Sequence, residues 1–379
     1  MKKKKAPDLF GEVKQDGDGE KGHKEKLGRY SRAKEHQLRV VDYLKEFEPS
    51  MKREIKALEG CSKFLVFRHY SSAGQYRLIG GCTCQKHLLC PMCAIRRAAR
   101  TVREVEKKVR AVLAENPSLI PVLITTTVKN GESLEERYEH ITTCRKKLLQ
   151  NRRTAQKSRI KNKSVTGLIH GSFGSYEFKQ GSGGHGWHPH SHEIALLEPT
   201  VKFQKVFRKG KWVDCPVEFE KALQAEWLEI TGDSFMIDVR RIHMKGTPDS
   251  PDSLLKAICE ASKYALKLED IELEDQIHAY KVLQGRRLNF TYGSLYGINP
   301  DKLQDTIEDE LRLLPYIDLI YSFYSGIYNL SDVTDTGDSF LPQSSDRVKD
   351  QKGVSNARLL KGLRFAEQVK EYARGVRGG

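Results

Sequence analysis

The sequence predicts an α+β protein with antiparallel strands. Residues 122–128 read Val-Leu-Ile-Thr-Thr-Thr-Val, a continuous β-branched run typical of a central strand. Two further strand-like stretches cover residues 165–179 and 187–197, and the glycine-rich segment 180–184 between them predicts a turn. The second stretch should therefore return antiparallel to the first. Amphipathic helical patterns flank the strands, at residues 134–154, 217–230 and 253–268.

The composition indicates a basic protein with a polyanionic partner. The chain has 379 residues, and 65 Lys and Arg against 50 Asp and Glu give 65 − 50 = +15. This surplus favours nucleic acid as the partner. No apolar run is long enough for a membrane span, and the lysines of residues 1–5 precede no apolar segment typical of a secretory signal. We therefore expect a cytoplasmic protein.

Changes in composition along the chain predict five segments. The first has few apolar residues, which predicts a disordered basic arm, and the last is polar and basic. The aromatic-rich stretch 316–328 should either pack on the preceding domain or form an oligomer surface, as in a homodimer. The segments are an arm (1–28), a helical, zinc-binding and basic-helix region (29–116), a strand-and-helix domain (117–300), a helical extension (301–330) and a flexible tail (331–379).

Three histidines alternate at the start of the predicted strand 187–197. Because successive side chains in a strand point to opposite faces, His188, His190 and His192 share one face and can converge on a divalent metal. Glu177 falls in the strand predicted to pair with them. A carboxylate beside imidazoles makes a mixed site able to hold Mg²⁺ or Mn²⁺. The alternative is a histidine-rich loop entering a core strand, with Glu177 merely exposed.

A cysteine cluster precedes the strand domain. Cys90 and Cys93 form a Cys-Pro-Met-Cys knuckle, a turn that lets two thiolates bind one structural Zn²⁺. Proximity favours Cys82 and Cys84 as the other pair, with Cys61 as a competitor; His87 is a further candidate. The eight cysteines lie in a chain without an export signal, which favours reduced thiols and metal binding over disulfides. Scattered thiols or a redox Cys-x-x-Cys are the alternatives.

A basic helix is predicted directly after the knuckle, over residues 94–115. Arg96, Arg97 and Arg100 begin a strongly cationic surface that continues along this helix. A zinc knuckle followed by such a helix is typical of a DNA-docking unit. A solvated helix face braced by zinc is the simpler interpretation.

The helix predicted over 253–268 carries a glutamate, a tyrosine and a lysine at helical spacing. Glu260 and Tyr264 stand at i and i+4, so they are neighbours on one face, and Lys267 lies about a turn further on. A tyrosine oxygen is a poor nucleophile at its usual pKa of about 10, and a nearby lysine can stabilise the phenolate. A neighbouring carboxylate can act as general base for a water. Taken alone, these residues are more typical of a solvated helix face than of a catalytic site.

Three stretches together resemble a known family. Residues 122–130, 186–196 and 260–267 resemble, in order, the three motifs of the rolling-circle replication initiators of the HUH endonuclease superfamily, especially the plasmid group with one active-site tyrosine. The Cys90–Cys93 knuckle with its paired arginines and the segment 285–297 also resemble that group. The resemblance covers about residues 60–298. Two positions depart from the pattern: Ser191 replaces a usually apolar residue, and 125–127 is Thr-Thr-Thr instead of a leucine-containing motif.

The resemblance implies an antiparallel sheet flanked by helices, with the histidine motif on a central strand and residues 117–300 as the nicking domain. His190, His192 and Glu177 would hold the metal, with His188 a ligand or a neighbour. Tyr264 would attack a phosphodiester of single-stranded or cruciform origin DNA, giving a 5′-phosphotyrosine and a 3′-OH primer. Glu260 would activate the water that ends the round.

The implied activity is a metal-dependent DNA endonuclease with strand-transfer (ligation) activity. Its partners would be origin DNA, a host helicase and the replication machinery. DNA contacts are predicted at Lys129, Asn130 and Lys263, besides the arginines of the basic helix. Two alternatives remain: a single-tyrosine transposase or mobilisation relaxase, which the zinc-and-arginine region argues against, and a non-catalytic zinc-dependent nucleic-acid-binding regulator.

Overall fold

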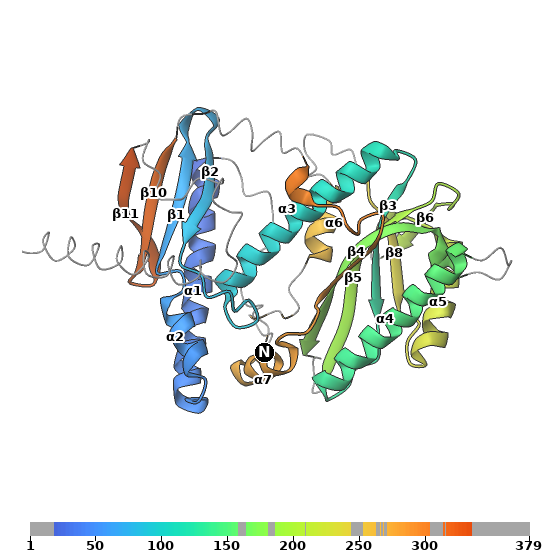
Figure 1. The fold of residues 1–379 in the computed structure, drawn as a ribbon, viewed down its shortest axis with the longest axis horizontal. Coiled ribbons are helices and arrows are strands. Elements are labelled where there is room, and N and C mark those ends of the chain that lie inside the picture. Colours follow the sequence, from blue (N-terminus) through green and yellow to red (C-terminus); the bar gives the residue numbers. More distant parts are fainter. Residues whose placement is uncertain are drawn as a thin grey trace, which may run out of the picture. The chain divides into compact units, whose positions relative to one another are not determined.

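The computed structural model of the chain contains two compact units (Figure 1). The first unit comprises Met1–Gln15 and His87–Asp305, and the second comprises Asp16–Lys86 and Thr306–Gly379. The structure describes residues 19–157, 164–180, 186–208, 210–243, 253–262, 266, 268, 271–303, 314 and 316–335. The described helices are too short or too polar for any of them to span a lipid bilayer.

A five-stranded antiparallel sheet forms the centre of the first unit. Its strand order is β8-β3-β5-β4-β9, so the histidine strand β5 lies in the middle. The combination of helices with an antiparallel sheet confirms the predicted α+β class, and β3 and β5 match the predicted strands closely. The strands are β3 (Ile120–Thr127), β4 (Ile169–Gln180), β5 (Trp187–Leu197), β8 (Ile237–Arg241) and β9 (Asn289–Gly293). A separate ribbon pairs β6 (Gln204–Arg208) with β7 (Lys211–Cys215).

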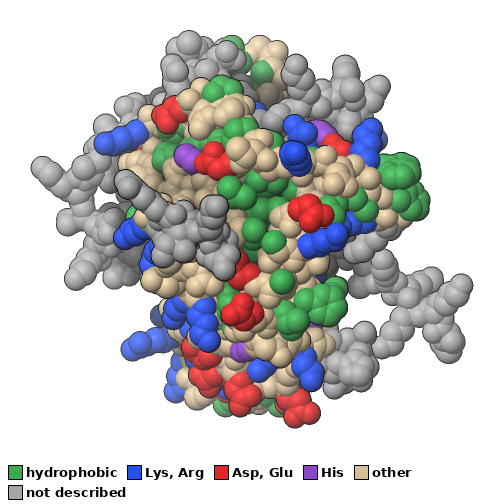
Figure 2. Space-filling view, turned by 90° about the vertical axis from the view of Figure 1, so that its right-hand side faces the viewer, with side chains coloured by type: hydrophobic (Ala, Val, Ile, Leu, Met, Phe, Trp, Pro, Cys, Tyr) green, Lys and Arg blue, Asp and Glu red, His purple; other side chains and the backbone are tan. Residues whose placement is uncertain are grey.

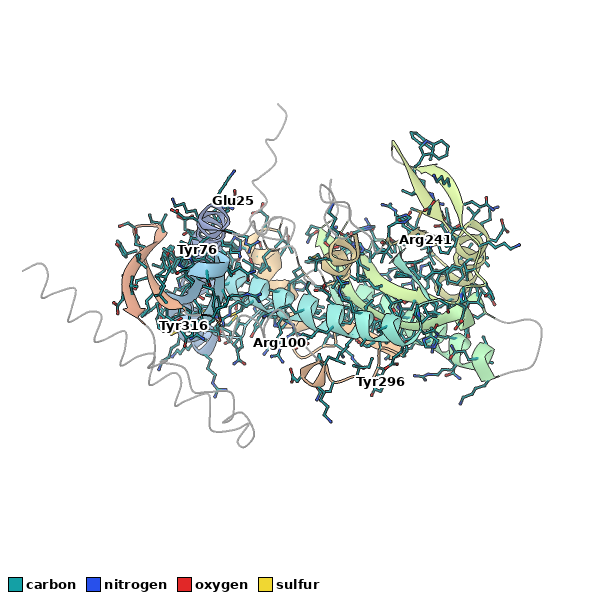
Figure 3. All side chains as sticks on the ribbon, turned by 90° about the horizontal axis from the view of Figure 1, so that it is seen from above. Glu25, Tyr76, Arg100, Arg241, Tyr296 and Tyr316 are labelled. Atoms are coloured by element: carbon teal, nitrogen blue, oxygen red, sulfur yellow. The ribbon has the colours of Figure 1, made fainter. Side chains whose placement is uncertain are left out.

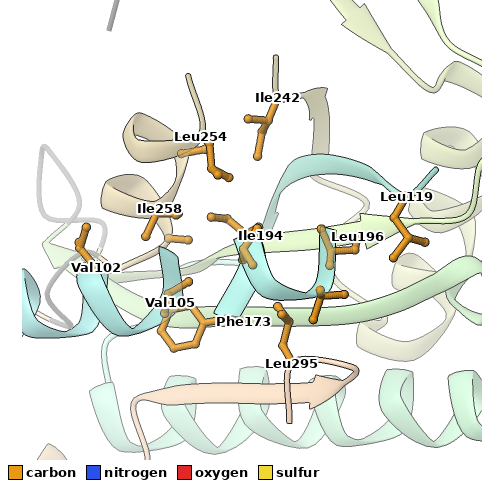
Figure 4. Close-up of a cluster of buried hydrophobic side chains, with 14 residues drawn as sticks. Val102, Val105, Leu119, Phe173, Ile194, Leu196, Ile242, Leu254, Ile258 and Leu295 are labelled. Atoms are coloured by element: carbon orange, nitrogen blue, oxygen red, sulfur yellow. The ribbon is translucent and has the colours of Figure 1, made fainter. Parts of the chain in front are cut away.

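Helices pack on both faces of this sheet. The helices of the unit are α3 (Pro91–Glu115), α4 (Leu134–Lys157), α5 (Val217–Thr231), α6 (Ser253–Ala261) and α7 (Leu273–Leu283), with short 3₁₀ turns at Val165–Leu168 and Pro300–Lys302. On one face, α3 and α6 enclose a hydrophobic core with Phe173, Ile194 and Leu196 (Figure 4). Val105 of α3 and Ile258 of α6 belong to the same cluster. The basic helix α3 is thus a core element of the first unit, not only a surface helix.

The opposite face of the sheet holds a buried polar network. Arg145 of α4 is 3 % exposed and forms an ion pair with Glu193, which is 1 % exposed. Ser172 donates a hydrogen bond to Glu193 at 2.7 Å, and the Tyr292 hydroxyl also donates to this carboxylate. Arg145 donates to Ser191 at 3.2 Å. Residues of three strands and one helix therefore satisfy a charge pair that burial alone would disfavour.

The second unit is a four-stranded antiparallel sheet of order β11-β10-β1-β2 with two helices. Its elements are α1 (Glu20–Phe47), α2 (Lys52–Gly60), β1 (Phe64–Tyr70), a 3₁₀ turn (Ser71–Ala73), β2 (Gln75–Gly81), β10 (Ile317–Tyr324) and β11 (Ile327–Asp335). The buried rings of Phe67 and Tyr321 pack around His23, whose Nε2 lies 2.8 Å from the Tyr321 hydroxyl. Segments far apart in sequence thus build one core.

Several predicted boundaries differ from the structure. Helix α1 begins at Glu20, inside the predicted disordered arm. Strands β10 and β11 occupy 317–335, where a helical extension and a flexible tail were predicted. The pairing of β10 with β1 involves residues some 250 positions earlier in the chain, and local composition does not reveal such a partner. Helix α6 ends at Ala261, short of the predicted 268, while the helix predicted from 301 to 314 lies largely outside the described residues.

The buried ion pair should dominate the stability of the first unit. The Arg145→Met variant leaves Glu193 charged and buried without its cation, so we expect a loss of about 3–5 kcal/mol of unfolding free energy. Urea unfolding followed by tryptophan fluorescence measures this loss, because Trp187, Trp212 and Trp227 all lie in the first unit. Arg110→Met is the control. It removes an exposed pair with Glu106 and should cost less than about 1 kcal/mol. Equal losses in both variants would contradict the assignment.

Candidate metal centre and active site

The register of β4 and β5 places a carboxylate opposite the histidines. Glu177 pairs directly with His190, as the sequence pattern predicted. One ligand atom each from Glu177, His190 and His192 lies within 4.8 Å of the other two. Their exposed fractions are 0 %, 5 % and 6 %. We call these three residues the metal group.

Hydrogen bonds hold the metal group together. The Nε2 atoms of His190 and His192 lie 2.5 and 3.0 Å from Oε2 of Glu177. Burial by itself raises the pKa of the Glu177 carboxyl, but the hydrogen bonds from the two imidazoles outweigh it and leave that pKa well below 4.5. Burial lowers the pKa of His190 below 6.5, although Glu177 opposes the effect. Metal ligation requires an ionised carboxylate and a neutral imidazole, and the two pKa shifts favour these states for Glu177 and His190.

Neighbouring side chains orient the imidazoles. Thr125 on β3 faces His192 across the strand pair, and its Oγ1 lies 3.1 Å from Nδ1 of that ring. His188 is not a member of the metal group, and its Nδ1 lies 2.5 Å from Oδ1 of Asn130. Asn130, predicted to contact DNA, thus holds His188 beside the site. Such partners fix ring orientation and raise ligand basicity.

Lys179 is a site residue that the sequence analysis missed. Its Nζ lies 3.1 Å from Oε1 of Glu177 and 3.3 Å from Nε2 of His190, and its side chain is 34 % exposed. The signal was present, because Lys179 stands two residues after Glu177 in the same strand and therefore on the same face. It adds a cation, suited to a phosphate, at the solvent edge of the site.

Helix α6 brings Glu260 to the metal group. Oε1 of Glu260 lies 3.7 Å from Nε2 of His192. Ser175 of β4 donates a hydrogen bond to the carbonyl of Ala261 at 2.8 Å, which ties the end of α6 to the sheet. Further on, Leu266 forms an isolated bridge with Phe178, the neighbour of Glu177. The chain is therefore fixed beside the metal group on both sides of residues 263–265.

The predicted nucleophile lies within that short interval. Tyr264, Lys263 and Lys267 are outside the described residues. Residue 264 is two positions from Ser262 and two from Leu266, both of which are buried.

The predicted DNA-contacting cations are divided between exposed and part-buried positions. Arg97 and Arg100 are exposed on α3, where Arg100 pairs with Glu104 one turn later, and Arg96 is half-buried. Lys129 is exposed at the end of β3. Burial therefore favours Arg97, Arg100 and Lys129 as residues available to phosphates.

The cysteines of the predicted zinc site lie in both units, and their environments differ. In the second unit, the backbone N–H of Cys84 donates to Sγ of Cys61 at 3.4 Å, while Cys82 presents its carbonyl oxygen to the Cys61 thiol at 3.8 Å. In the first unit, Cys90 and Cys93 are buried at the start of α3. Cys61 is therefore adjacent to Cys84, as zinc binding by that pair requires.

The donor set fits a divalent metal ion. Two imidazole nitrogens and one carboxylate suit Mn²⁺ and related ions and leave coordination positions open for a substrate oxygen. Nδ1 of His190 is buried and has no hydrogen-bond partner among the described residues, so the ring is held through its Nε2 edge, where the group converges. The residues present thus match the predicted metal centre.

Comparison with known sequences agrees with this geometry. A family model described as a replication protein matches residues 75–317. That span is more than half of the chain, and it contains the metal group, α6 and the predicted tyrosine. The chain belongs to this family of replication proteins.

Curated relatives in this family are distant. "Protein rep" of Lactiplantibacillus plantarum is 23 % identical over 278 residues, which are 73 % of this chain and 80 % of the relative. "Protein rep" of Streptococcus pneumoniae serotype 2 (strain D39) is 24 % identical over 266 residues, 68 % of this chain and 74 % of that protein. No solved structure matches the chain.

Thr125 should tune metal affinity through His192. The Thr125→Val variant keeps the shape of the side chain but removes the hydroxyl, so we expect Mn²⁺ affinity to fall about tenfold or more, as is typical when a ligand loses its orienting partner. Titration calorimetry with Mn²⁺ measures the change. The control is Thr127→Val: Thr127 faces His190 on the same strand, and its hydroxyl makes no hydrogen bond to the residues that the structure describes. Equal affinities for the two variants would exclude the orienting role.

Proposed function

We propose that this protein is an HUH-type endonuclease that nicks single-stranded origin DNA to initiate rolling-circle replication of a plasmid. The observation that carries the proposal is the metal group with Glu260 of α6 beside it; in the sequence, Tyr264 follows Glu260 by four residues. Membership of the replication protein family supports it.

The metal group would bind a divalent ion, which when bound polarises the phosphodiester and stabilises developing charge on its oxygens. Glu177, His190 and His192 hold the ligand atoms, and Thr125 keeps the His192 ring in orientation. Lys179 adds a positive charge at the solvent edge of the group and so favours entry of a phosphate there.

The cleavage step would use the phenolic oxygen of Tyr264. This oxygen loses its proton and attacks phosphorus, the bond from phosphorus to the 3′ oxygen breaks, and the leaving oxygen takes up a proton to become a 3′-OH. The DNA is left joined through its 5′ phosphate to Tyr264, so the energy of the phosphodiester is kept in the new bond. A free 3′-OH can prime synthesis.

The release step would use Glu260. Its carboxylate is 34 % exposed, so it is accessible to water while remaining near His192. It would remove a proton from a water molecule that attacks the phosphotyrosine, and the tyrosine oxygen would leave with a proton. Hydrolysis in place of a second strand transfer ends the round after one copy.

We further propose a structural zinc ion at the cysteines. Cys90 and Cys93 supply the knuckle, and the second pair is drawn from Cys61, Cys82 and Cys84. The hydrogen bond from Cys84 to the Cys61 sulfur favours Cys61 and Cys84 over the pair Cys82 and Cys84, which sequence proximity favoured. Origin DNA, a host helicase and the replication machinery would be the partners.

The nucleophile can be tested directly. Wild-type protein incubated with Mn²⁺ and a 5′- or 3′-labelled single strand carrying the cognate origin should give a covalent adduct labelled only on the 3′ side of the nick, visible on a denaturing gel. Tyr264→Phe lacks the phenolic oxygen and should form no adduct, and a chelator should abolish the adduct of the wild type. The Tyr280→Phe variant is the matched control and should retain the adduct. An adduct that persists in Tyr264→Phe excludes this tyrosine; binding without any adduct supports a non-catalytic regulator.

The cysteine assignment has a separate readout. We expect about one zinc per chain in purified wild-type protein by elemental analysis, because a closed four-ligand site retains its metal. Cys61→Ser should lose the zinc, whereas Cys82→Ser should keep it. The reverse result would assign Cys82 as the ligand. Wild-type protein purified without zinc would contradict the proposed zinc site.

A further inference from the structure

The β6–β7 ribbon exposes two aromatic rings beside the sheet (Figure 3). Phe207 is 60 % exposed and Trp212 is 69 % exposed. The two residues are paired across the ribbon, with ring centroids 5.5 Å apart in a T-shaped arrangement. Single exposed apolar side chains are ordinary, but two large rings placed together on a projecting ribbon indicate a binding surface.

The other face of the ribbon is anchored, so the rings are presented by a rigid support. Arg208 donates to both carboxylate oxygens of Glu220, at 2.9 and 2.6 Å, and to Asp238 at 3.1 Å. Glu220 also accepts from the backbone N–H of Val239 at 2.7 Å, on the open edge of β8. Cys215 is fully buried beneath this cluster. The ribbon is thus clamped to the edge strand by charged hydrogen bonds.

The charge around the rings favours a polyanion. Lys202 and Lys205 are exposed shortly before Phe207. Asp214 lies opposite Lys205 across the ribbon, and Arg208 is paired with Glu220 on the other face. Lys205 is exposed and, two residues before Phe207, lies on the same face of the ribbon. Figure 2 shows the same kind of mixture on one face of the molecule, with hydrophobic side chains at the surface among Lys and Arg. Flat rings beside cations suit unpaired bases and their phosphates.

The ribbon lies at the level of the metal group. Arg208 contacts Asp238, which pairs with Thr125, which in turn pairs with His192. Residues directly opposite in these ladders share one face, so Asp238 and His192 point to the same side of the sheet. Two strand spacings separate them, about 10 Å. A strand of DNA held at the metal group therefore has only a short path to the ribbon.

We infer that the ribbon binds the single-stranded DNA that flanks the nick, with Phe207 and Trp212 stacking on its bases. The inference rests on the proposed function, because it takes the metal group as the place of the scissile phosphate. It assigns to the ribbon a contact that is independent of sequence, since every base offers a face for stacking.

Trp212 provides its own probe. Among the three tryptophans, Trp187 and Trp227 are buried and Trp212 is exposed, so stacking on Trp212 should quench its fluorescence. In the full-length Tyr264→Phe protein, oligo-dT of about 20 nucleotides should quench the emission and bind, while a duplex of the same length should not quench it. The added Trp212→Phe change should remove the quench. Replacing both rings by Ala should weaken binding about tenfold or more for each ring, measured by anisotropy of labelled oligo-dT.

Leu228→Ala is the matched control, because Leu228 is a 44 % exposed apolar residue on α5 and should leave both signals unchanged. Oligo-dT that binds equally well to the double Ala variant, or that fails to quench Trp212, overturns the ribbon assignment. Quenching by the duplex alone overturns it as well. Adduct formation by the wild type at the cognate origin reports on the nicking activity separately, so loss of the ribbon assignment and loss of the proposed function give different results.

Discussion

The register between β4 and β5 is the constraint on which the site depends. Side chains alternate along a strand, so Glu177 faces the histidines only because it is paired with His190. A slip of one residue would turn Glu177 to the other face of the sheet and bring Phe178 to the histidines. The metal group is thus a property of strand pairing, and any element that stabilises this register also stabilises the site.

That register is specified by the two faces of β5, because one face is apolar and the other is polar. On one face, Ile194 and Leu196 complete a hydrophobic core with α3 and α6. On the other, Ser191 and Glu193 meet Arg145. A slipped strand would place a carboxylate in the hydrophobic core and leave the Arg145 guanidinium buried without its partner, which is costly on both faces. The polar network therefore secures the site from the opposite side of the sheet.

The residues of the metal group could be predicted from local sequence. The side chains that orient them could not. Alternation along a strand was enough to predict that His190 and His192 share a face, and the glycine-rich turn was enough to place Glu177 opposite them. Thr125 could not be found in this way, because its role depends on the offset between β3 and β5, which lie about 65 residues apart in sequence. The sheet of the second unit was beyond prediction for the same reason, since β1 pairs with β10 across most of the chain.

The two departures from the resembled motifs lie opposite each other in the structure. Ser191 stands between the two metal-group histidines, and Thr126 stands in the first motif; in the structure they are directly opposite each other. Their hydroxyl oxygens are 2.7 Å apart, and Ser191 also accepts from Arg145. An apolar residue in only one of these places would leave the other hydroxyl buried with one partner fewer. The two positions therefore form one polar contact across β3 and β5, on the face of the sheet opposite the metal group.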